Sequence, residues 1–448
     1  MTVFVRFAPS PTGRLHIGNI RAALFNYLFA HKNGGRFLLR LDDTDQERST
    51  QEFAQAIERD MRWLGLTWDA FDKQSSRTHR YQEELEKLKA AGRVYPCFET
   101  PDELNLKRKT QLGRGLPPVY DRAALKLSPD DIAKLIESGK KPHWRFKLDH
   151  VDVEWDDLVQ KHKAYPASAI SDPVIVREDG IPLYTFCSVV DDADMGITHV
   201  IRGEDHVTNT AVQIQLWQAV TDKPVPQFAH FPLLVNATGE EMSKRLGTLS
   251  IASLRDDMHI EAMAINSLLA KLGTSDPITP CLSMNELAQS FDFAKISRNT
   301  AKFDVEELKI LSAKIIHQTP FSAISERLDT LGLGHVTEAF WNAVRANLTT
   351  IEDVRLWWQV ANGPVSPLIE EKPFIDEAAA LLPPAPWDQT TWSTWTNAVK
   401  EKTGRKGKEL FMPLRRALTG LDHGPELKVL LPLIGRENAL KRLTGTQA

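Results

Sequence analysis

Short apolar runs and a longer helical stripe alternate at the start of the chain. Val3–Ala8 (VFVRFA) and Arg36–Leu41 (RFLLRL) carry enough apolar and β-branched residues to predict two strands. Between them, apolar residues within Ile17–Leu28 recur on one face of a helix, which the Gly34–Gly35 pair ends. Strand, turn, helix and strand in this order predict a βαβ unit of a parallel α/β sheet.

Two further helical stripes follow this unit. Phe53–Leu64 and Tyr81–Leu88 have apolar residues at helical spacing, and Ser49 with Glu52 fits a capping box before the first stripe. We therefore expect residues 1–95 to form the first half of a parallel-sheet domain.

The middle of the chain changes character twice. Residues 96–182 are richer in proline and lysine and hold short strand-like runs, which predicts an inserted α+β domain with a basic surface. A solvated loop region is the alternative on charge alone. Tyr184–Asp194 returns to sheet-like patterning, Val207–Val220 predicts a helix and Gln227–Val235 predicts a strand. Residues 183–249 should therefore complete the parallel sheet.

The remainder of the chain carries almost only helical patterns. Gly363–Pro367 and Leu382–Pro386 are breaks between helical groups. We expect helical domains over residues 250–315 and 316–448.

Composition agrees with an ordinary globular protein. The 448 residues are 42% hydrophobic and 25% charged, which leaves room for about three domains. The chain starts with a predicted strand rather than a signal segment, and no apolar run reaches the length of a membrane helix. Cys97, Cys187 and Cys281 are too far apart for a disulfide framework, so we expect a cytoplasmic, reduced protein without membrane association. With a net charge of −4, a polyanionic partner would need local basic patches.

The turn after the first predicted strand is the strongest candidate for chemistry. It runs from Pro9 to Asn19 as PSPTGRLHIGN, where two prolines keep the chain extended. Gly13 and Gly18 permit close approach of another molecule, and a helix N-terminus is a phosphate site. The turn is neither a P-loop nor a dinucleotide fingerprint. Taken alone, it fits any nucleotide-binding α/β fold.

Charged residues gather at the same predicted sheet edge. Arg6, Asp42 and Arg202 lie on or directly after predicted strands, where open α/β sheets bind ligands. A surface ion pair is the alternative for each arginine. An exposed turn with the sequence Met242-Ser243-Lys244-Arg245 follows the strand that ends near Val235.

These motifs resemble those of class I aminoacyl-tRNA synthetases. His16-Ile17-Gly18 resembles the His-Ile-Gly-His signature, and the Met242–Arg245 stretch resembles the Lys-x-Ser-Lys-Arg loop. The flanking letters of Arg6–Gly18 and Arg21–Tyr27 look like the glutamyl branch, and Gly407–Gly420 resembles the end of the same enzymes. The resemblance implies a Rossmann-like α/β catalytic domain interrupted by an acceptor-stem-binding domain. All-α stem-contact and anticodon-binding domains would follow.

The resemblance also implies an activity. The chain would ligate L-glutamate to tRNA(Glu) through a glutamyl-adenylate, using ATP and Mg²⁺, and we expect a monomer. Whether tRNA(Gln) is a second partner is left open. His16 and Lys244 would be the catalytic residues, because an imidazole at a helix N-terminus and a mobile ammonium can both hold phosphates. The expected ATP-binding residues are Ser10, Thr12, Gly13, His16, Gly18, Asn19, Glu204, Asp205, His206, Ser243, Lys244 and Arg245. The expected glutamate-binding residues are Arg6, Ala8, Ser10, Asp42, Tyr184, Ser188 and Arg202.

Four positions depart from the family pattern. Asp42 stands where a glutamate usually contacts the substrate ammonium, and Glu241 replaces the first lysine of the loop motif. Of the cysteines that bind zinc in some members only Cys97 is present, and Tyr120–Arg122 adds none, so no structural zinc is expected. Asn347–Ile351 has threonines where some members carry an arginine that reads the anticodon, which leaves anticodon discrimination open.

Other functions predict different chains. A glutaminyl-tRNA synthetase should end in β-barrels, a glutamyl-queuosine type enzyme should lack the last third, and a small nucleotidyltransferase should be shorter. An inactive tRNA-binding paralogue is the alternative from a different class, because Asp42 and Glu241 are off-pattern.

Overall fold

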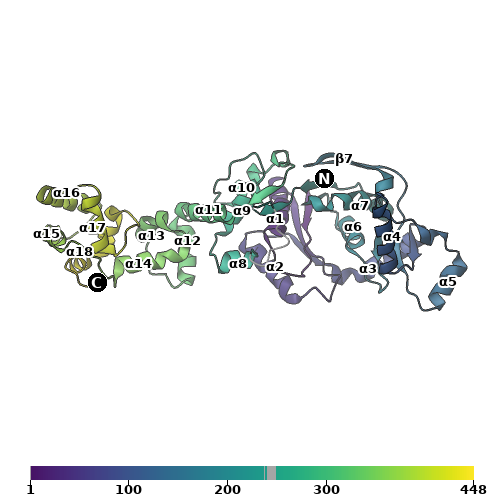
Figure 1. Ribbon diagram of the computed structural model, residues 1–448, viewed down its shortest axis with the longest axis horizontal. Helices are drawn as coiled ribbons and strands as arrows, with labels where there is room; N and C mark the ends of the chain where they lie inside the picture. Colours follow the sequence, from purple (N-terminus) through teal and green to yellow (C-terminus); the bar gives the residue numbers. More distant parts are fainter. Residues whose placement is uncertain (1, 237, 240–248) are drawn as a thin grey trace. The chain divides into compact units, whose positions relative to one another are not determined.

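The computed structural model describes residues 2–236, 238–239 and 249–448 (Figure 1). The chain divides into two compact units. The first comprises Met1–Met258 with Asn266–Asp304, and the second comprises His259–Ile265 with Val305–Ala448. Every described strand belongs to the first unit, and the second is built from helices.

Two sheets with parallel strands form the centre of the first unit. One has the order β1-β2-β3, and the other has the order β7-β6-β10-β9. In the first sheet Phe4 to Phe7 pair in register with Arg36 to Leu39. The backbone N–H of Thr198, next to β9, donates to the carbonyl of Phe4 in β1 at 2.9 Å, so the two sheets continue each other edge to edge. These strands are β1 (Phe4–Phe7), β2 (Arg36–Leu41), β3 (Ala70–Lys73), β6 (Val153–Asp157), β7 (Lys161–Tyr165), β9 (His199–Gly203) and β10 (Gln227–Phe231).

Helices pack on these sheets through apolar faces. Phe186, Val190 and Trp217 join one buried cluster with Leu38 of β2 and Phe228 of β10. Burial of such side chains from water is the main stabilising term of the fold. The helices are α1 (Ile17–Lys32), α2 (Gln51–Trp63), α3 (Thr78–Ala90), α6 (Tyr184–Met195) and α7 (Val207–Val220).

A smaller antiparallel sheet lies within the region predicted as an insertion. It has the order β4-β5-β8, and its strands are β4 (Val94–Cys97), β5 (His143–Phe146) and β8 (Val174–Val176). Two helices, α4 (Pro101–Gly113) and α5 (Pro129–Glu137), have no buried residue. The β6–β7 hairpin of the same region pairs with β10, so it extends the parallel sheet.

Helices α8 (Ile251–Asp256), α9 (Ala262–Lys271) and α10 (Met284–Ser290) follow. A short strand, β12 (Ala301–Phe303), pairs in parallel with β11 (Leu234–Asn236).

The second unit has a core that includes the fully buried Trp341 and Trp395. Its helices are α11 (Val305–Gln318), α12 (Phe321–Thr330), α13 (Glu338–Val344), α14 (Val354–Asn362), α15 (Lys372–Ala380), α16 (Thr391–Thr403), α17 (Lys408–Thr419) and α18 (Leu427–Leu443). Within the described ranges no helix has both the length and the apolar content of a membrane span.

The α/β fold class with a helical C-terminal part is confirmed, but three local predictions were wrong. Tyr184–Met195 is helix α6 and not a strand, because its apolar residues Phe186, Val189, Val190 and Ala193 follow helical spacing. Thr50, not Ser49, caps α2 by accepting the N–H of Phe53. The strand predicted over Gln227–Val235 is two strands, β10 and β11.

Candidate active site

His16 caps helix α1 at the end of the proline-rich turn. Its Nδ1 accepts the N–H of Asn19 at 3.4 Å, and the Asn19 side chain accepts the N–H of His16 at 3.2 Å. Burial lowers the pKa of His16, so its ring is neutral at pH 7, and because Nδ1 accepts, Nε2 carries the proton. A Cβ at Gly18 would lie 3.2 Å from this ring, which is a tighter contact than most Cβ atoms make. The helix N-terminus therefore presents an N–H donor on the imidazole.

The chain that follows the Met-Ser-Lys-Arg motif is anchored to the same place. The N–H of Ile251 donates to the carbonyl of Leu15 at 3.0 Å, and Ser250 forms an antiparallel bridge with His16. Ser243, Lys244 and Arg245, which were predicted to bind ATP, lie outside the described residues, as does Glu241.

The other predicted ATP-binding residues lie in two segments. Ser10, Thr12 and Gly13 belong to the turn between β1 and α1, where the side chains of Ser10 and Thr12 are exposed. Glu204, Asp205 and His206 form a single 3₁₀ turn directly after β9. Both segments follow the carboxyl ends of parallel strands, as expected for a nucleotide site at the sheet edge.

Helix α6 presents four polar residues at helical spacing. Tyr184 lies at its start, Ser188 one turn later, and Asp191 and Asp192 after a further turn. The Ser188 hydroxyl is buried and has no hydrogen-bond partner among the described residues. This face of α6 supplies two predicted glutamate-binding residues and two aspartates that were not predicted.

Asp192 joins two arginines from neighbouring strands. It accepts from Nε of Arg6 at 3.0 Å and from Nη1 of Arg40 at 2.7 Å, and all three side chains are buried. Burial acts against ionisation of Asp192, but Arg6 and Arg40 outweigh it and hold its pKa below the usual value. The terminal nitrogens of Arg6 have no hydrogen-bond partner within the described part of the chain. Arg6 is therefore fixed by Nε and keeps its outer donors for a ligand.

Asp42 is held by the same network. Its carboxylate accepts from Nε of Arg40 at 2.8 Å and from Nη2 at 3.3 Å. Burial raises the pKa of Asp42 to about 6, although the adjacent guanidinium of Arg40 opposes the shift. Asp42, which is shorter than the glutamate of the family pattern, is thus paired with Arg40 of the protein itself.

Arg202 is a buried cation whose hydrogen-bond partners are neutral. Its Nη1 donates to the hydroxyl of Tyr184 at 3.0 Å, and its Nη2 donates at 2.7 Å to both Thr210 and Gln213. Only 6% of Arg202 is exposed, and in the described ranges no carboxylate lies within ion-pair distance. Burial is the main reason why its pKa is lowered. A buried cation without an anion is costly, so this site suits a carboxylate ligand.

The structure thus links Arg6, Asp42, Tyr184 and Arg202 through two contact networks that meet on α6. Sequence reasoning missed Arg40 and Asp192, which hold Arg6 and Asp42 in place. Neither belongs to a motif that could have identified it. The one available signal was the neighbouring aspartates Asp191 and Asp192, which follow the apolar residues Phe186, Val189 and Val190.

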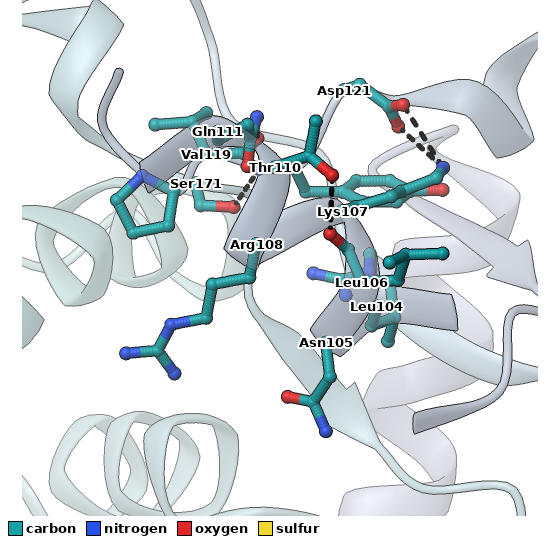
Figure 2. Close-up of a pocket in the computed structure, with 13 residues that line it drawn as sticks. Leu104, Asn105, Leu106, Lys107, Arg108, Thr110, Gln111, Val119, Asp121 and Ser171 are labelled. Carbon is teal, nitrogen blue, oxygen red and sulfur yellow. Dashed lines mark hydrogen bonds and ion pairs between the residues drawn. The ribbon is translucent and has the colours of Figure 1, made fainter. Parts of the chain in front are cut away.

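A separate cavity of about 550 Å³ opens beside helix α4. Figure 2 shows Lys107 of this helix directed toward Asp121, while Arg108 and Asn105 extend away from that pair. Apolar and basic side chains of α4 both line this cavity: Leu106, which is 67% exposed, stands next to Lys107 and Arg108. Lys107 is therefore paired within the protein, whereas Arg108 extends away from that pair.

Three possible metal ligands meet near this cavity. Donor atoms of Cys97, Glu99 and His143 lie within 4.8 Å of one another. The Tyr120 hydroxyl donates to Glu99 at 2.5 Å, and the Cys97 thiol donates to that hydroxyl at 3.8 Å. Burial raises the pKa of Cys97 to about 12 and lowers that of His143. This group holds one cysteine and one histidine beside a carboxylate that already accepts from Tyr120, whereas structural zinc is usually held by four cysteine or histidine ligands, so the residues fit a zinc ion poorly.

Comparisons with known proteins show the family of the chain. The family model for the catalytic domain of class I tRNA synthetases (E and Q) matches residues 2–310, and an anticodon binding domain model matches residues 369–446. Glutamate–tRNA ligase of Azospirillum brasilense is 59% identical over 448 residues, the whole of both chains. Glutamate–tRNA ligase 2 of Methylorubrum populi is 57% identical and covers 99% of each chain.

Solved structures give the same result. A crystal structure of a glutamate tRNA ligase from Elizabethkingia meningosepticum, in complex with its amino acid, superposes with a TM-score of 0.85 at 25% identity. The match covers 99% of this chain and 98% of that one. The chain therefore belongs to the glutamyl-tRNA synthetases, a family of class I aminoacyl-tRNA synthetases.

Proposed function

We propose that the site at the sheet edge binds L-glutamate beside ATP, and that the chain is an ATP-dependent glutamate–tRNA ligase. It joins glutamate to ATP as a glutamyl-adenylate and transfers the glutamyl group to tRNA(Glu). Arg202 carries this proposal, because it is a buried guanidinium with neutral partners only. A substrate carboxylate would supply the missing negative charge.

The remaining glutamate contacts follow from the residues around Arg202. The free nitrogens of Arg6 suit a second carboxylate oxygen, and the unpartnered hydroxyl of Ser188 suits a polar atom of the ligand. Asp42 is the acid proposed for the substrate ammonium, and it would have to share its carboxylate with Arg40. Ala8 and Ser10 would border the ligand from the turn that follows β1.

ATP would lie at the N-terminus of α1. The Nε2–H of His16, together with the positive end of the helix dipole, is suited to phosphate oxygens. Lys244 stands six positions before Ser250, which pairs with His16. Mg²⁺ would neutralise the triphosphate in the usual way.

The basic helix α4 and the helical second unit are the proposed tRNA contacts. Lys107, Arg108 and Lys109 give α4 a run of cations, and α4 buries none of its residues. We assign residues 96–182 to the acceptor stem, 250–315 to stem contact and 316–448 to the anticodon. RNA binding should weaken with salt, because lysine and arginine release counterions from phosphates. We further propose a cytoplasmic monomer.

The direct test is aminoacylation of tRNA(Glu) and tRNA(Gln) side by side with labelled glutamate. Charging of tRNA(Glu) alone would define a discriminating enzyme, and charging of both would define a non-discriminating one. The absence of charging and of pyrophosphate exchange with either tRNA would favour a tRNA-binding protein without activity.

The same preparation tests the proposed absence of structural zinc, since metal analysis should find far less than one zinc per chain.

A further inference from the structure

A buried histidine connects Arg202 to an aspartate of the β6–β7 hairpin. His230 of β10 is the direct register partner of Arg202 of β9, so both side chains project from the same face of the sheet. Nε of Arg202 donates to Nε2 of His230 at 3.3 Å. Nδ1 of His230 lies 2.5 Å from Oδ2 of Asp157, and both residues are almost completely buried.

The protonation of this group is determined by its partners. His230 can accept from Arg202 at Nε2 only if its proton is on Nδ1, where it donates to Asp157. Burial lowers the pKa of His230, which keeps the ring neutral. Asp157 is itself fixed by the backbone N–H groups of Val159 and Gln160 at 3.0 and 2.8 Å. The carboxylate therefore selects one tautomer, and that tautomer presents a lone pair to Arg202.

The arrangement leaves one edge of the guanidinium available. His230 holds Nε, while Thr210 and Gln213 hold Nη2. The hydroxyl of Thr210 also lies 3.0 Å from Nε2 of His230, so the histidine contacts both Nε of Arg202 and the threonine that accepts from Nη2. Nη1 has a single partner within the described residues, the hydroxyl of Tyr184. Nη1 is thus the nitrogen left for a ligand carboxylate.

We propose that Asp157 and His230 are positioning residues for glutamate recognition, which act by orienting Arg202 without neutralising it. A carboxylate placed directly against Arg202 would cancel the charge that attracts the substrate, whereas a neutral imidazole fixes the geometry and leaves the charge intact. This inference rests on the proposed role of Arg202. It also gives the β6–β7 hairpin a function in amino-acid binding, although that hairpin lies in the region predicted to bind the acceptor stem.

The test is the KM for glutamate and for ATP in pyrophosphate exchange with the full chain and tRNA(Glu). Asp157→Asn should raise the KM for glutamate at least about fivefold. Without the carboxylate, the proton of His230 is no longer fixed on Nδ1, and a proton on Nε2 would leave the buried Nε–H of Arg202 without an acceptor. The KM for ATP should change by less than about twofold. Asp156→Asn is the matched control, because this neighbouring carboxylate has 93% of its side chain exposed. It should leave both constants unchanged.

Two substitutions of His230 separate positioning from stability. His230→Gln places an amide, with an oxygen that can accept, near the position of Nε2, whereas the shorter His230→Asn places its amide near Nδ1 only and leaves nothing near Nε2. We expect the Gln variant to bind glutamate more tightly than the Asn variant at equal melting temperatures. Equal KM values for glutamate, or losses that follow the melting temperature, would overturn the proposal even if Asp157→Asn does not fold. Arg202→Gln completes the set: if it leaves the KM for glutamate unchanged, the proposed role of Arg202 is itself wrong.

Discussion

The Nδ1 atom of His16 accepts the backbone N–H of Asn19 at 3.4 Å, so one imidazole both caps helix α1 and carries an N–H donor at its N-terminus. A capping residue contributes about 1 kcal/mol to stability, whereas a donor to transferring phosphate acts on the rate. The two roles use different ring nitrogens, and substitutions can therefore separate them.

His16→Asn should preserve the cap and remove the donor. Asparagine is among the best capping residues, so the free energy of unfolding should stay within about 0.5 kcal/mol of wild type. Glutamate activation should fall roughly a hundredfold. His16→Ala should lose the same activity and about 1 kcal/mol of stability as well. Urea unfolding and pyrophosphate exchange measure the two effects, and full activity of the Asn variant would contradict a phosphate role.

Lys244→Ala should lower the rate of glutamate activation with little change in tRNA affinity. An ammonium that neutralises the leaving pyrophosphate acts in the transition state, so its loss should reduce kcat by about a hundredfold or more. Pyrophosphate exchange and filter binding of tRNA(Glu) measure the two quantities. Lys87→Ala, which removes an exposed lysine of α3, is the control. A normal exchange rate in the Lys244 variant would refute its role.

The binding of glutamate should weaken in acid because of Asp42. Burial raises its pKa to about 6, so Asp42 gains a proton and loses its charge as the pH falls through 6. The KM for glutamate should rise below pH 6, while the KM for ATP serves as the internal control. In Asp42→Asn the KM for glutamate should be high at every pH. A wild-type KM that stays constant from pH 7 to pH 5 would exclude an ammonium contact by this carboxylate.

The same shift has a consequence for stability. The pKa of Asp42 in the folded chain lies above its unfolded value of about 3.9, so the folded state binds the proton more tightly. The contribution of Asp42 to the free energy of unfolding is therefore largest below pH 4 and is lost as the pH rises through 6.

Asp192→Asn should be one of the most destabilising conservative substitutions in the first unit. It would leave Arg6 and Arg40 buried without the carboxylate that they share, at a cost of about 3–5 kcal/mol. Asp179→Asn breaks an exposed pair with Arg177 and should cost less than about 1 kcal/mol. Guanidinium unfolding of both variants is the measurement, and similar losses would argue against a buried network.

The sequence was sufficient to predict elements with local signals. β1, α1, β2 and α7 lie where their apolar patterns placed them, and the described chain after Asp304 is helical as expected. Helix α6 was missed because tyrosine, threonine, cysteine and two valines gave its sequence a strand-like composition. Its polar residues Ser188, Asp191 and Asp192 are buried, so α6 lacks the solvent-facing polar side of an ordinary surface helix.

Long-range contacts could not be predicted. The strand ends that carry Arg6, Asp42 and Arg202 followed from the parallel-sheet rule, but their partners did not. Asp157 reaches His230 through the pairing of β6 with β10, and nothing in either segment encodes that pairing locally. Such buried polar contacts depend on tertiary structure and therefore require coordinates.

The pairing of β11 with β12 limits how far the chain can be shortened by engineering. β11 directly precedes the Met-Ser-Lys-Arg segment, and its backbone hydrogen-bond partners come from Ala301–Phe303. A fragment truncated after residue 249 would expose β11 as an open edge, which invites aggregation. A minimal glutamate-activating fragment should therefore extend to Asp304, well beyond the last sequence motif of the active site.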